Sequence, residues 1–175
     1  MTGSIAAYKS CSLVSALLGE KAEVRVMATD AALRFVTSMT FQALCGSPVY
    51  SDIWHSHHPD EIEHISVPHW ADLIVIAPAT ANTLAKIAHG FADNFLTAAV
   101  LAAKPETPVF LAPAMNTYMW QNPITQRKLA SLLQDDTYHL IKPREGMLAC
   151  GDVGVGKMAD VSDIIEAMKR QVKSC

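Results

Sequence analysis

The chain has 175 residues, of which 50% are hydrophobic and 18% are charged, and its formal net charge is −3 with a pI near 6.1. This length corresponds to about one domain, and the apolar composition excludes a disordered chain or a coiled coil. The small net charge excludes a field that attracts nucleic acid or an anionic membrane as the default partner. Because the charged fraction is below the ~25% of an average soluble protein, the surplus apolar surface predicts oligomer interfaces.

A membrane anchor and a cysteine-based metal or redox site are not expected. The longest apolar stretches, such as residues 95–103, are shorter than the ~18 to 20 residues that span a bilayer, and no charged-then-apolar leader opens the chain. We therefore expect a cytoplasmic protein. The four cysteines form no CxxC pair, which argues against a zinc ribbon and a thioredoxin-like couple; they are Cys11, Cys45, Cys150 and Cys175.

Helical and apolar β-branched segments alternate along the chain. In chain order we predict a helix at 5–18, strands at 23–28 and 72–77, helices at 81–88 and 94–103, a strand at 108–112, a helix at 118–133, a strand at 138–141 and a helix at 161–172. Gly19 and Gly90 are expected to end two of the helices as C′ residues. Because the strands are continuously apolar, the pattern predicts an α/β fold with a three-layer doubly wound parallel sheet, flavodoxin-like or Rossmann-like, forming a single domain over residues 1–175.

Three segments depart from this pattern. The first helix begins within five residues of Met1, so the strand that should precede it is almost absent. Residues 47–67 and 142–157 have no clear periodicity; the first is rich in His and acidic residues and the second in glycine. Loops of an α/β domain are where function usually resides, so we expect functional residues there.

Two strand-to-helix turns carry hydroxyl side chains and free backbone N–H groups, which together favour an anion. The first turn is residues 2–5 (Thr-Gly-Ser-Ile) and the second is residues 78–83 (Pro-Ala-Thr-Ala-Asn-Thr). Each turn taken alone is also explained by ordinary helix capping. Since both turns lie at the carboxyl edge of the predicted sheet, they indicate a nucleotide or flavin site.

Two further segments carry candidate chemistry. Asn116 follows the strand at 108–112 and is either a helix cap or a hydrogen-bond donor directed into the crevice. The helical spacing of Met119 and Trp120 after it favours a core position over a cofactor wall. Cys150 lies in the glycine-dense segment 149–158, which is either a mobile flap or a surface loop with an incidental thiol.

Histidines are concentrated in the irregular segment. His64 lies a few residues before an apolar strand, where a lone His is more often structural than catalytic. The trio His55, His57 and His58 resembles a ligand set, but no Cys or suitably spaced acid completes it. We therefore expect no metal site.

In combination these motifs resemble the flavin-containing cysteine decarboxylases. The resemblance covers essentially the whole chain and is carried by GSIAAYK at 3–9, His64-Ile65 before WAD at 70–72, PATANT at 78–83, PAMN at 113–116 followed by Met119-Trp120, and ACGD at 149–152. Within the family, the glycine-rich flap after Cys150 is similar to that of members acting on 4'-phosphopantothenoylcysteine, a coenzyme A precursor. The resemblance implies a homo-oligomer, a trimer or a dodecamer of trimers, with FMN near subunit contacts.

The resemblance also implies a role for individual residues. His64 matches the acid/base histidine, Cys150 the proton-donating cysteine and Asn116 the substrate-orienting asparagine of the family. Other implied substrate contacts are Met147, Ala149 and Met158, the last on the closing flap. The implied FMN contacts are Gly3, Ser4, Ile5, Thr29, Asp30, Thr80, Ala81, Asn82, Thr83 and Ala114.

The implied reaction forms 4'-phosphopantetheine by transient oxidation. FMN takes a hydride equivalent from the cysteinyl CH2–S unit, the resulting thioaldehyde allows CO2 to leave, and the enethiolate is reduced again. Three alternatives remain open: a peptidyl-cysteine decarboxylase, a flavin prenyltransferase, and a non-enzymatic relative that regulates a protein phosphatase. The joint presence of His64, Asn116 and Cys150 favours the decarboxylase.

Overall fold

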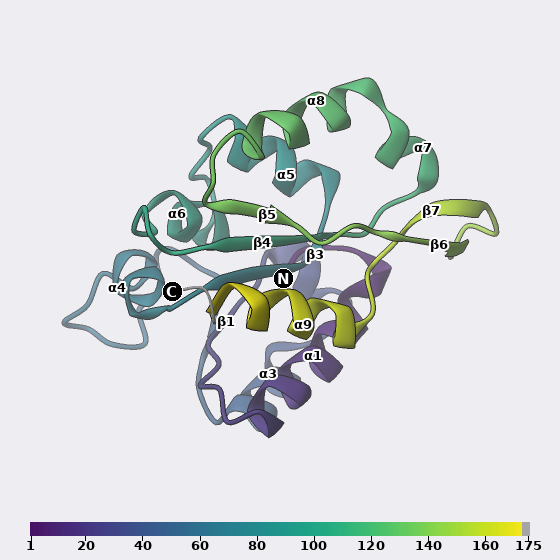
Figure 1. Cartoon of the computed structure of the whole chain (residues 1–175). Coiled ribbons are helices and arrows are strands. Elements are labelled where there is room, and N and C mark those ends of the chain that lie inside the picture. The colour runs from purple at the N-terminus through teal and green to yellow at the C-terminus, as the bar shows by residue number, and fades with distance from the viewer. Residues whose placement is uncertain (173–175) are drawn as a thin grey trace.

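The computed structural model describes residues 1–172, in which helices cover both faces of a set of parallel strands (Figure 1). The central strands β3 (Ile74–Ala79), β4 (Val109–Pro113) and β5 (Tyr138–Leu140) form a parallel sheet in that order, with Ile74 opposite Val109 and Val109 opposite Tyr138. The prediction of an α/β fold with buried parallel strands is confirmed. All five residues of β4 are buried, as expected for a strand covered on both faces.

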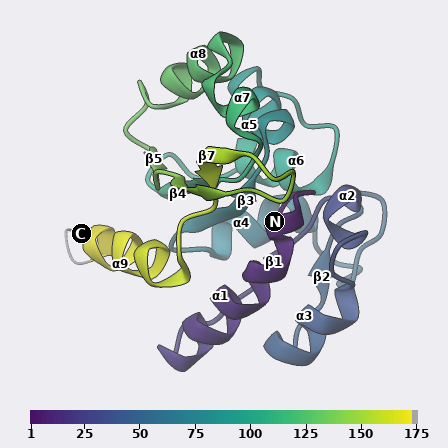
Figure 2. The ribbon, with the colours of Figure 1, turned by 90° about the vertical axis from the view of Figure 1, so that its right-hand side faces the viewer.

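Alternate residues of β3 face two different helical layers. Ala77 packs with α1 (Tyr8–Gly19) and α9 (Val161–Val172) on one face. Ile74 and Ile76 pack on the other face with α5 (Ala81–Ala88), α6 (Phe95–Leu101) and α8 (Pro123–Leu132). The side view in Figure 2 shows the same separation, with α1 and α9 below the strands and α5 and α8 above them.

The N-terminal strand pair is shorter than predicted and stands apart from the central sheet. The strand expected at 23–28 is reduced to β1 (Val26–Met27), which pairs in parallel with β2 (Val49–Tyr50). Within residues 1–172, no backbone pairing joins β1 to β3, so the expected single sheet is divided. Met1 lies beside the end of β1. Its ammonium donates to the Met27 carbonyl, 2.5 Å away, and its carbonyl accepts from the Thr29 N–H.

The structure corrects four details of the predicted elements. The helix expected at 118–133 is broken into α7 (Thr117–Gln121) and α8 because Pro123 cannot continue α7 and instead begins α8. Gly90 has φ 69° as expected, whereas Gly19 is the last residue of α1 and Lys21 takes the positive φ of 63°.

The irregular segment 47–67 contains the start of helix α4 (Glu63–Trp70), and 142–157 forms the antiparallel hairpin of β6 (Arg144–Met147) and β7 (Val153–Lys157). The remaining helices are η1 (Ile5–Ala7), α2 (Asp30–Leu33) and α3 (Ser38–Cys45).

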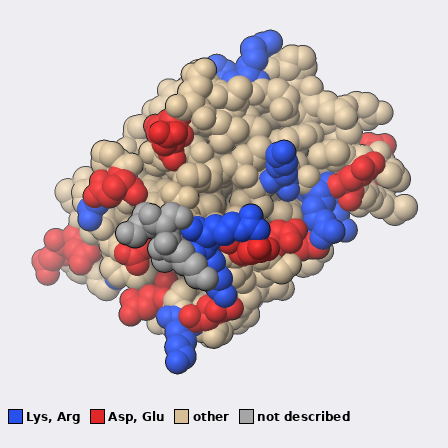
Figure 3. All heavy atoms as spheres, viewed as in Figure 1, with Lys and Arg blue, Asp and Glu red and all other residues tan. Residues whose placement is uncertain are grey.

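Basic and acidic side chains alternate on the surface around α9 and form ion pairs with one another. Figure 3 shows Lys, Arg, Asp and Glu interspersed there. The pairs on this part of the surface are Lys9–Asp160, Arg144–Asp160, Lys169–Glu20 and Arg170–Glu166. Among the described residues, no helix has the length and hydropathy needed to cross a bilayer.

The buried N-terminal amine makes the stability of the chain pH-dependent. Burial lowers the pKa of the Met1 ammonium from 8.0 to about 5. Between these values the unfolded chain binds the proton and the folded chain does not, so the free energy of unfolding rises with pH, by up to about 4 kcal/mol across this window. Chemical denaturation of the free and the N-terminally acetylated chain at pH 5 to 8 tests this. The acetylated chain should show a flatter profile, and equal slopes in the two forms would contradict the assignment.

Candidate active site

A cavity of about 550 Å³ opens at the carboxyl ends of the parallel strands. It is lined by most of the residues that the motifs predicted for the cofactor: Gly3, Ser4, Thr29, Asp30, Thr80, Ala81, Asn82, Thr83 and Ala114. Ile5, which was also predicted, is not among the lining residues, and its side chain is exposed. The sequence analysis missed the lining residues Ala31, Lys86, Asp93, Asn94, Met115 and Met119.

Thr2 fixes the two predicted anion turns to one another. Its buried hydroxyl donates to the Pro78 carbonyl at 2.8 Å and accepts from the Thr80 N–H at 3.0 Å. In the second turn, Thr80 Oγ1 caps α5 by accepting from the Thr83 N–H. Ser4 caps η1 in the same way, with its Oγ accepting from the Ala6 N–H. The two interpretations of these turns, helix capping and anion binding, are therefore compatible. The caps hold the N-terminal ends of η1 and α5 toward the cavity, where an anion would bind.

The first turn requires glycine because it lies against α2. A Cβ atom at Gly3 would lie 2.5 Å from the Ala31 Cβ, so any side chain would push α2 away from the cavity. The opposite rim is held by the ion pair of Lys86 and Asp93 at 2.5 Å, which lowers the pKa of the Asp93 carboxyl. A flat ligand with an anionic group fits this cavity, since its lining combines hydroxyls and helix N-terminal ends with the side chains of Met115 and Met119.

A compact polar cluster joins Asn116 to Cys150. The Asn116 Nδ2 donates to Asp152 Oδ2 at 2.9 Å and to the Cys150 Sγ at 3.3 Å, and the Cys150 thiol donates to Asp152 Oδ2 at 3.2 Å. The Asn116 Oδ1 accepts from the Tyr118 N–H at 2.8 Å. Asn116 is thus both a helix cap and a side-chain donor, which unites the two interpretations left open by the sequence. Asp152, to which no role was assigned, receives hydrogen bonds from both neighbours.

The β6–β7 hairpin carries Cys150 and packs closely on the turn before α7. The Met115 N–H donates to the Gly156 carbonyl at 3.0 Å. A Cβ at Gly154 would lie 2.5 Å from Thr117 Oγ1, and one at Gly156 would overlap the Met115 carbonyl oxygen. Glycine is therefore needed at both positions because the hairpin backbone touches this turn, and this contact places Cys150 beside Asn116.

Replacing Gly156 with alanine should displace the hairpin without emptying the cavity. The new methyl group would break the contact with Met115, and a shift of about 1 Å at a reacting group costs roughly 100-fold in rate. We expect binding of the flavin that the motifs imply to be kept and the implied decarboxylation to fall by about that factor, measured as CO2 release by the flavin-loaded protein. The control is Gly19→Ala, since nothing lies within 4 Å of a Cβ there. Equal activity of the two variants would contradict the packing argument.

His64 lies on α4, far from this cluster. Figure 1 shows α4 and the hairpin at opposite ends of the molecule, and Figure 2 shows the hairpin in front of the strands and α4 behind them. The preceding residue, Glu63, is buried and anchors the histidine-rich loop: its carboxylate accepts from the N–H groups of His57 and His58 and contacts His57 Nδ1 at 3.2 Å. His64 is half-buried and reaches neither Cys150 nor the cavity within one copy.

The structure separates the other predicted substrate contacts. Met147, 72% exposed, and Ala149 lie on the hairpin near Cys150. Met158 follows β7 and is 1% exposed in the core with Ala6 and Ile164, so the expectation that it lies on the flap is wrong. Met119 is 49% exposed and lines the cavity, whereas its spacing favoured a core position.

Residues 1–172 contain no group of three or more His, Cys, Asp or Glu side chains arranged to hold a metal ion.

Two relatives are similar to this chain over nearly its whole length. The chain is 47% identical to a probable phosphopantothenoylcysteine decarboxylase of Streptococcus mutans, over 98% of this chain and 96% of that protein. It is 45% identical to the coenzyme A biosynthesis bifunctional protein CoaBC of Bacillus subtilis, over 97% of this chain but 41% of that longer protein.

Solved structures of the same kind superpose on nearly the whole chain. A cysteine-to-serine variant of PPC decarboxylase in complex with pantothenoylaminoethenethiol has a TM-score of 0.86 and 40% identity, covering 99% of this chain and 95% of its own. The FMN-binding protein AtHal3 has a TM-score of 0.85 and 40% identity, covering 99% and 94%. The Flavoprotein family matches residues 1–173. The chain therefore belongs to the Flavoprotein family, in agreement with the resemblance that its motifs predicted.

Proposed function

We propose that this protein is an FMN-dependent carboxy-lyase that converts 4'-phosphopantothenoylcysteine to 4'-phosphopantetheine in coenzyme A biosynthesis. The observation that carries the proposal is the Asn116–Cys150–Asp152 cluster, formed between the hairpin and the turn before α7 beside a flavin-type cavity. The names of the relatives described above support the same substrate. We place the reaction in the cytoplasm.

Residues of the three strand-to-helix turns would hold the cofactor. The turn of Gly3 and Ser4 provides the close approach for the phosphate, with Thr29 and Asp30 beside it, and the turn from Thr80 to Thr83 would line the other side. Bound FMN supplies a two-electron sink that accepts electrons from the cysteinyl CH2–S unit and returns them, so that the net redox change is nil.

The protein's own side chains move protons and orient the substrate. The His64 imidazole would take the proton of the substrate thiol, and loss of CO2 then leaves an enethiolate. Cys150 holds a proton on Sγ, directed at Asp152 before substrate enters, and would deliver it to carbon in the final reduction. Asn116 would orient the carboxylate through a neutral hydrogen bond; a charged arginine would stabilise the ground-state carboxylate more than the CO2-like transition state.

The position of His64 calls for a second copy of the chain in each site. Helix α4, which carries His64, and the β6–β7 hairpin, which carries Cys150, lie at opposite ends of one copy (Figure 1), so one substrate molecule cannot contact both residues within it. A homo-oligomer in which α4 of one copy approaches the hairpin of the next would bring them together. We propose a trimer, or a dodecamer made of four trimers, with the substrate bound between copies. Exposed apolar side chains such as Tyr118 and Ile65 are available for these contacts.

The direct test is to purify the protein, record its flavin spectrum and follow CO2 release from 4'-phosphopantothenoylcysteine without oxygen. We expect a bound flavin, stoichiometric CO2 and 4'-phosphopantetheine as the only organic product. A peptide ending in cysteine serves as the competing substrate. Turnover of the peptide alone would identify a peptidyl-cysteine decarboxylase, and a flavin-loaded oligomer that leaves both compounds unchanged would overturn the enzymatic proposal.

A further inference from the structure

Glu63, the residue before His64, is the only Asp, Glu, Lys or Arg side chain that is buried within residues 1–172. Burying a carboxylate is unfavourable unless hydrogen bonds replace its bound water. Glu63 Oε1 accepts from the N–H groups of His57 and His58 at 2.8 and 2.9 Å, and Oε2 lies 3.2 Å from His57 Nδ1. Because a carboxylate only accepts hydrogen bonds, Nδ1 carries the hydrogen in this contact. These three partners all belong to the loop that precedes α4.

The first turn of α4 has little else to hold it. Its N-cap residue provides no side-chain hydrogen bond. Pro68 has no N–H, so the His64 carbonyl lacks the bond that the residue four positions later makes in a regular helix. The Ser66 hydroxyl donates to Glu61 at 2.6 Å, but Glu61 is itself exposed in the loop. The direction in which this turn presents His64 therefore depends on Glu63.

His57 connects Glu63 to the buried core. Its ring lies edge-on to that of Tyr50 in β2, with the two ring centroids 5.4 Å apart. Tyr50 is 2% exposed and packs with Phe95 and with Val67 of α4. Glu63 and Val67 are four residues apart and lie on the same face of α4. Two points on that face are thus fixed to the same core, one through polar contacts and one through apolar contacts.

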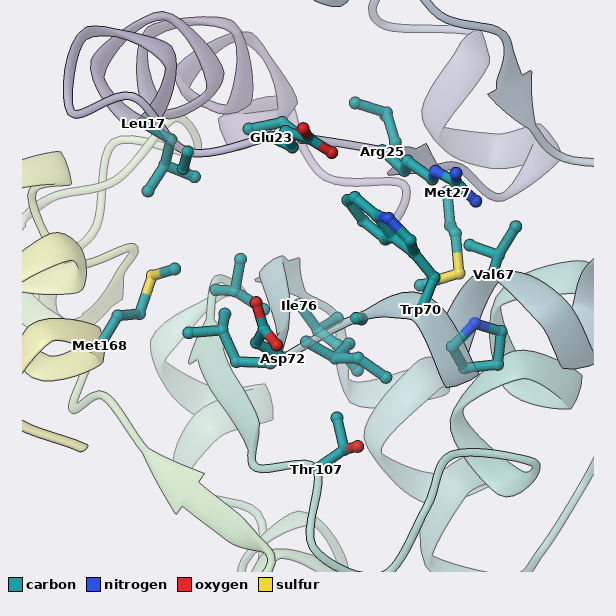
Figure 4. Close-up of a pocket in the computed structure, with 18 of the residues that line it drawn as sticks. Leu17, Glu23, Arg25, Met27, Val67, Trp70, Asp72, Ile76, Thr107 and Met168 are labelled. Carbon is teal, nitrogen blue, oxygen red and sulfur yellow. The ribbon is translucent and has the colours of Figure 1, made fainter. Parts of the chain in front are cut away.

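The other end of α4 is fixed separately. Figure 4 shows the Trp70 ring beside Arg25 in a pocket that both residues line, and the guanidinium carbon lies 4.2 Å from the ring centroid. This contact holds the last turn of the helix and does not reach its first turn. His64 follows Glu63 by about 100° around the helix axis and is half-buried. A rotation of the first turn would therefore move its imidazole.

We propose that Glu63 is a positioning residue, which binds the loop at His57 and His58 and so directs the His64 imidazole at the substrate. This role rests on the function proposed above, in which His64 takes the proton of the substrate thiol. It accounts for a carboxylate at a buried position where an apolar side chain would be at least as stable. Glu63 does not line the flavin-type cavity, so it acts through His64.

The test replaces Glu63 with leucine, an apolar side chain suited to a buried position. The released N–H groups can bond to water because the loop is largely exposed, so the Tm and the flavin content should remain native. Displacing the imidazole by about 1 Å should slow flavin reduction by the substrate roughly 100-fold without oxygen, with the half-saturating substrate concentration unchanged. Glu63→Gln should restore most of the rate, because its amide oxygen still accepts from both N–H groups.

His58→Ala is the matched control, since it removes an exposed side chain from the same loop and keeps the backbone N–H that Glu63 binds. It should reduce the flavin at the native rate. Hydrogen exchange provides a readout that does not depend on activity. The Ile65 and Ser66 amides, which both donate to the Ile62 carbonyl, should exchange at least about 10-fold faster in Glu63→Leu and at the native rate in Glu63→Gln.

Mixing subunits tests whether Glu63 acts through His64. Glu63→Leu mixed with Cys150→Ser should regain activity in about a quarter of sites, whereas Glu63→Leu mixed with His64→Asn should regain none. Native flavin reduction by Glu63→Leu, or recovery in the mixture with His64→Asn, would overturn the positioning role. A slower rate accompanied by loss of Tm or flavin would show a purely structural role and would also overturn it. A native chain whose flavin is not reduced by the substrate would instead overturn the proposed function.

Discussion

Replacing Cys150 with serine is expected to stop the reaction after CO2 has left. The early steps use the flavin and His64, neither of which the variant changes, so flavin reduction and CO2 release should proceed once. A serine hydroxyl in place of the thiol is a much weaker acid, and loss of a positioned proton donor costs about 100- to 10,000-fold in rate. Anaerobic single-turnover absorbance should show flavin that stays reduced, and mass spectrometry should show a decarboxylated product two hydrogens short of 4'-phosphopantetheine.

The matched control is Cys11→Ser, because Cys11 packs beside Val14 in a separate apolar cluster near the N-terminus. That variant should complete the reaction. A second comparison, Asp152→Asn, keeps the shape of the cluster but replaces the shared carboxylate acceptor, and should slow the final protonation less than loss of the thiol does. Complete turnover by Cys150→Ser would remove Cys150 from the mechanism.

The central sheet and the cofactor turns were predictable because their signals are local. Residues 72–77 and 108–112 are continuous apolar runs, and a strand covered on both faces needs that composition whatever surrounds it. The hydroxyls of Thr80 and Ser4 indicate helix starts for the same reason. Parallel strands end at one edge, so these turns converge without any knowledge of tertiary contacts.

The elements that were missed depend on contacts distant in sequence. Helix α4 carries Pro68 and has no amphipathic pattern, so it is held by packing on α6 rather than by its own periodicity. The β6–β7 hairpin is specified by the fit of Gly154 and Gly156 against the turn before α7, which spacing alone does not reveal. Met158 was misplaced for a related reason: the chain leaves β7 and enters the core within one residue. Residue Cys175 lies outside the described residues.

Mixing two inactive variants is expected to restore activity if the site is shared between copies. His64→Asn should block substrate oxidation, and Cys150→Ser should block the final protonation, so each oligomer alone is inactive in steady state. When subunits are exchanged in equal amounts, a site built from His64 of one copy and Cys150 of its neighbour has both native residues in about a quarter of cases. The measurement is steady-state formation of 4'-phosphopantetheine after refolding the variants separately and together.

We expect this recovery because His64 and Cys150 are too far apart within one copy to contact the same substrate molecule. With both residues contributed by one chain, no mixture could contain an intact site, and the mixed sample would be as inactive as its parents. The double variant mixed with native chain provides the matched control, because it should leave about a quarter of shared sites intact, against half if each chain made its own site. Recovery near these fractions would place the substrate between α4 and a neighbouring hairpin, whereas an inactive mixture would require His64 to act in some other role.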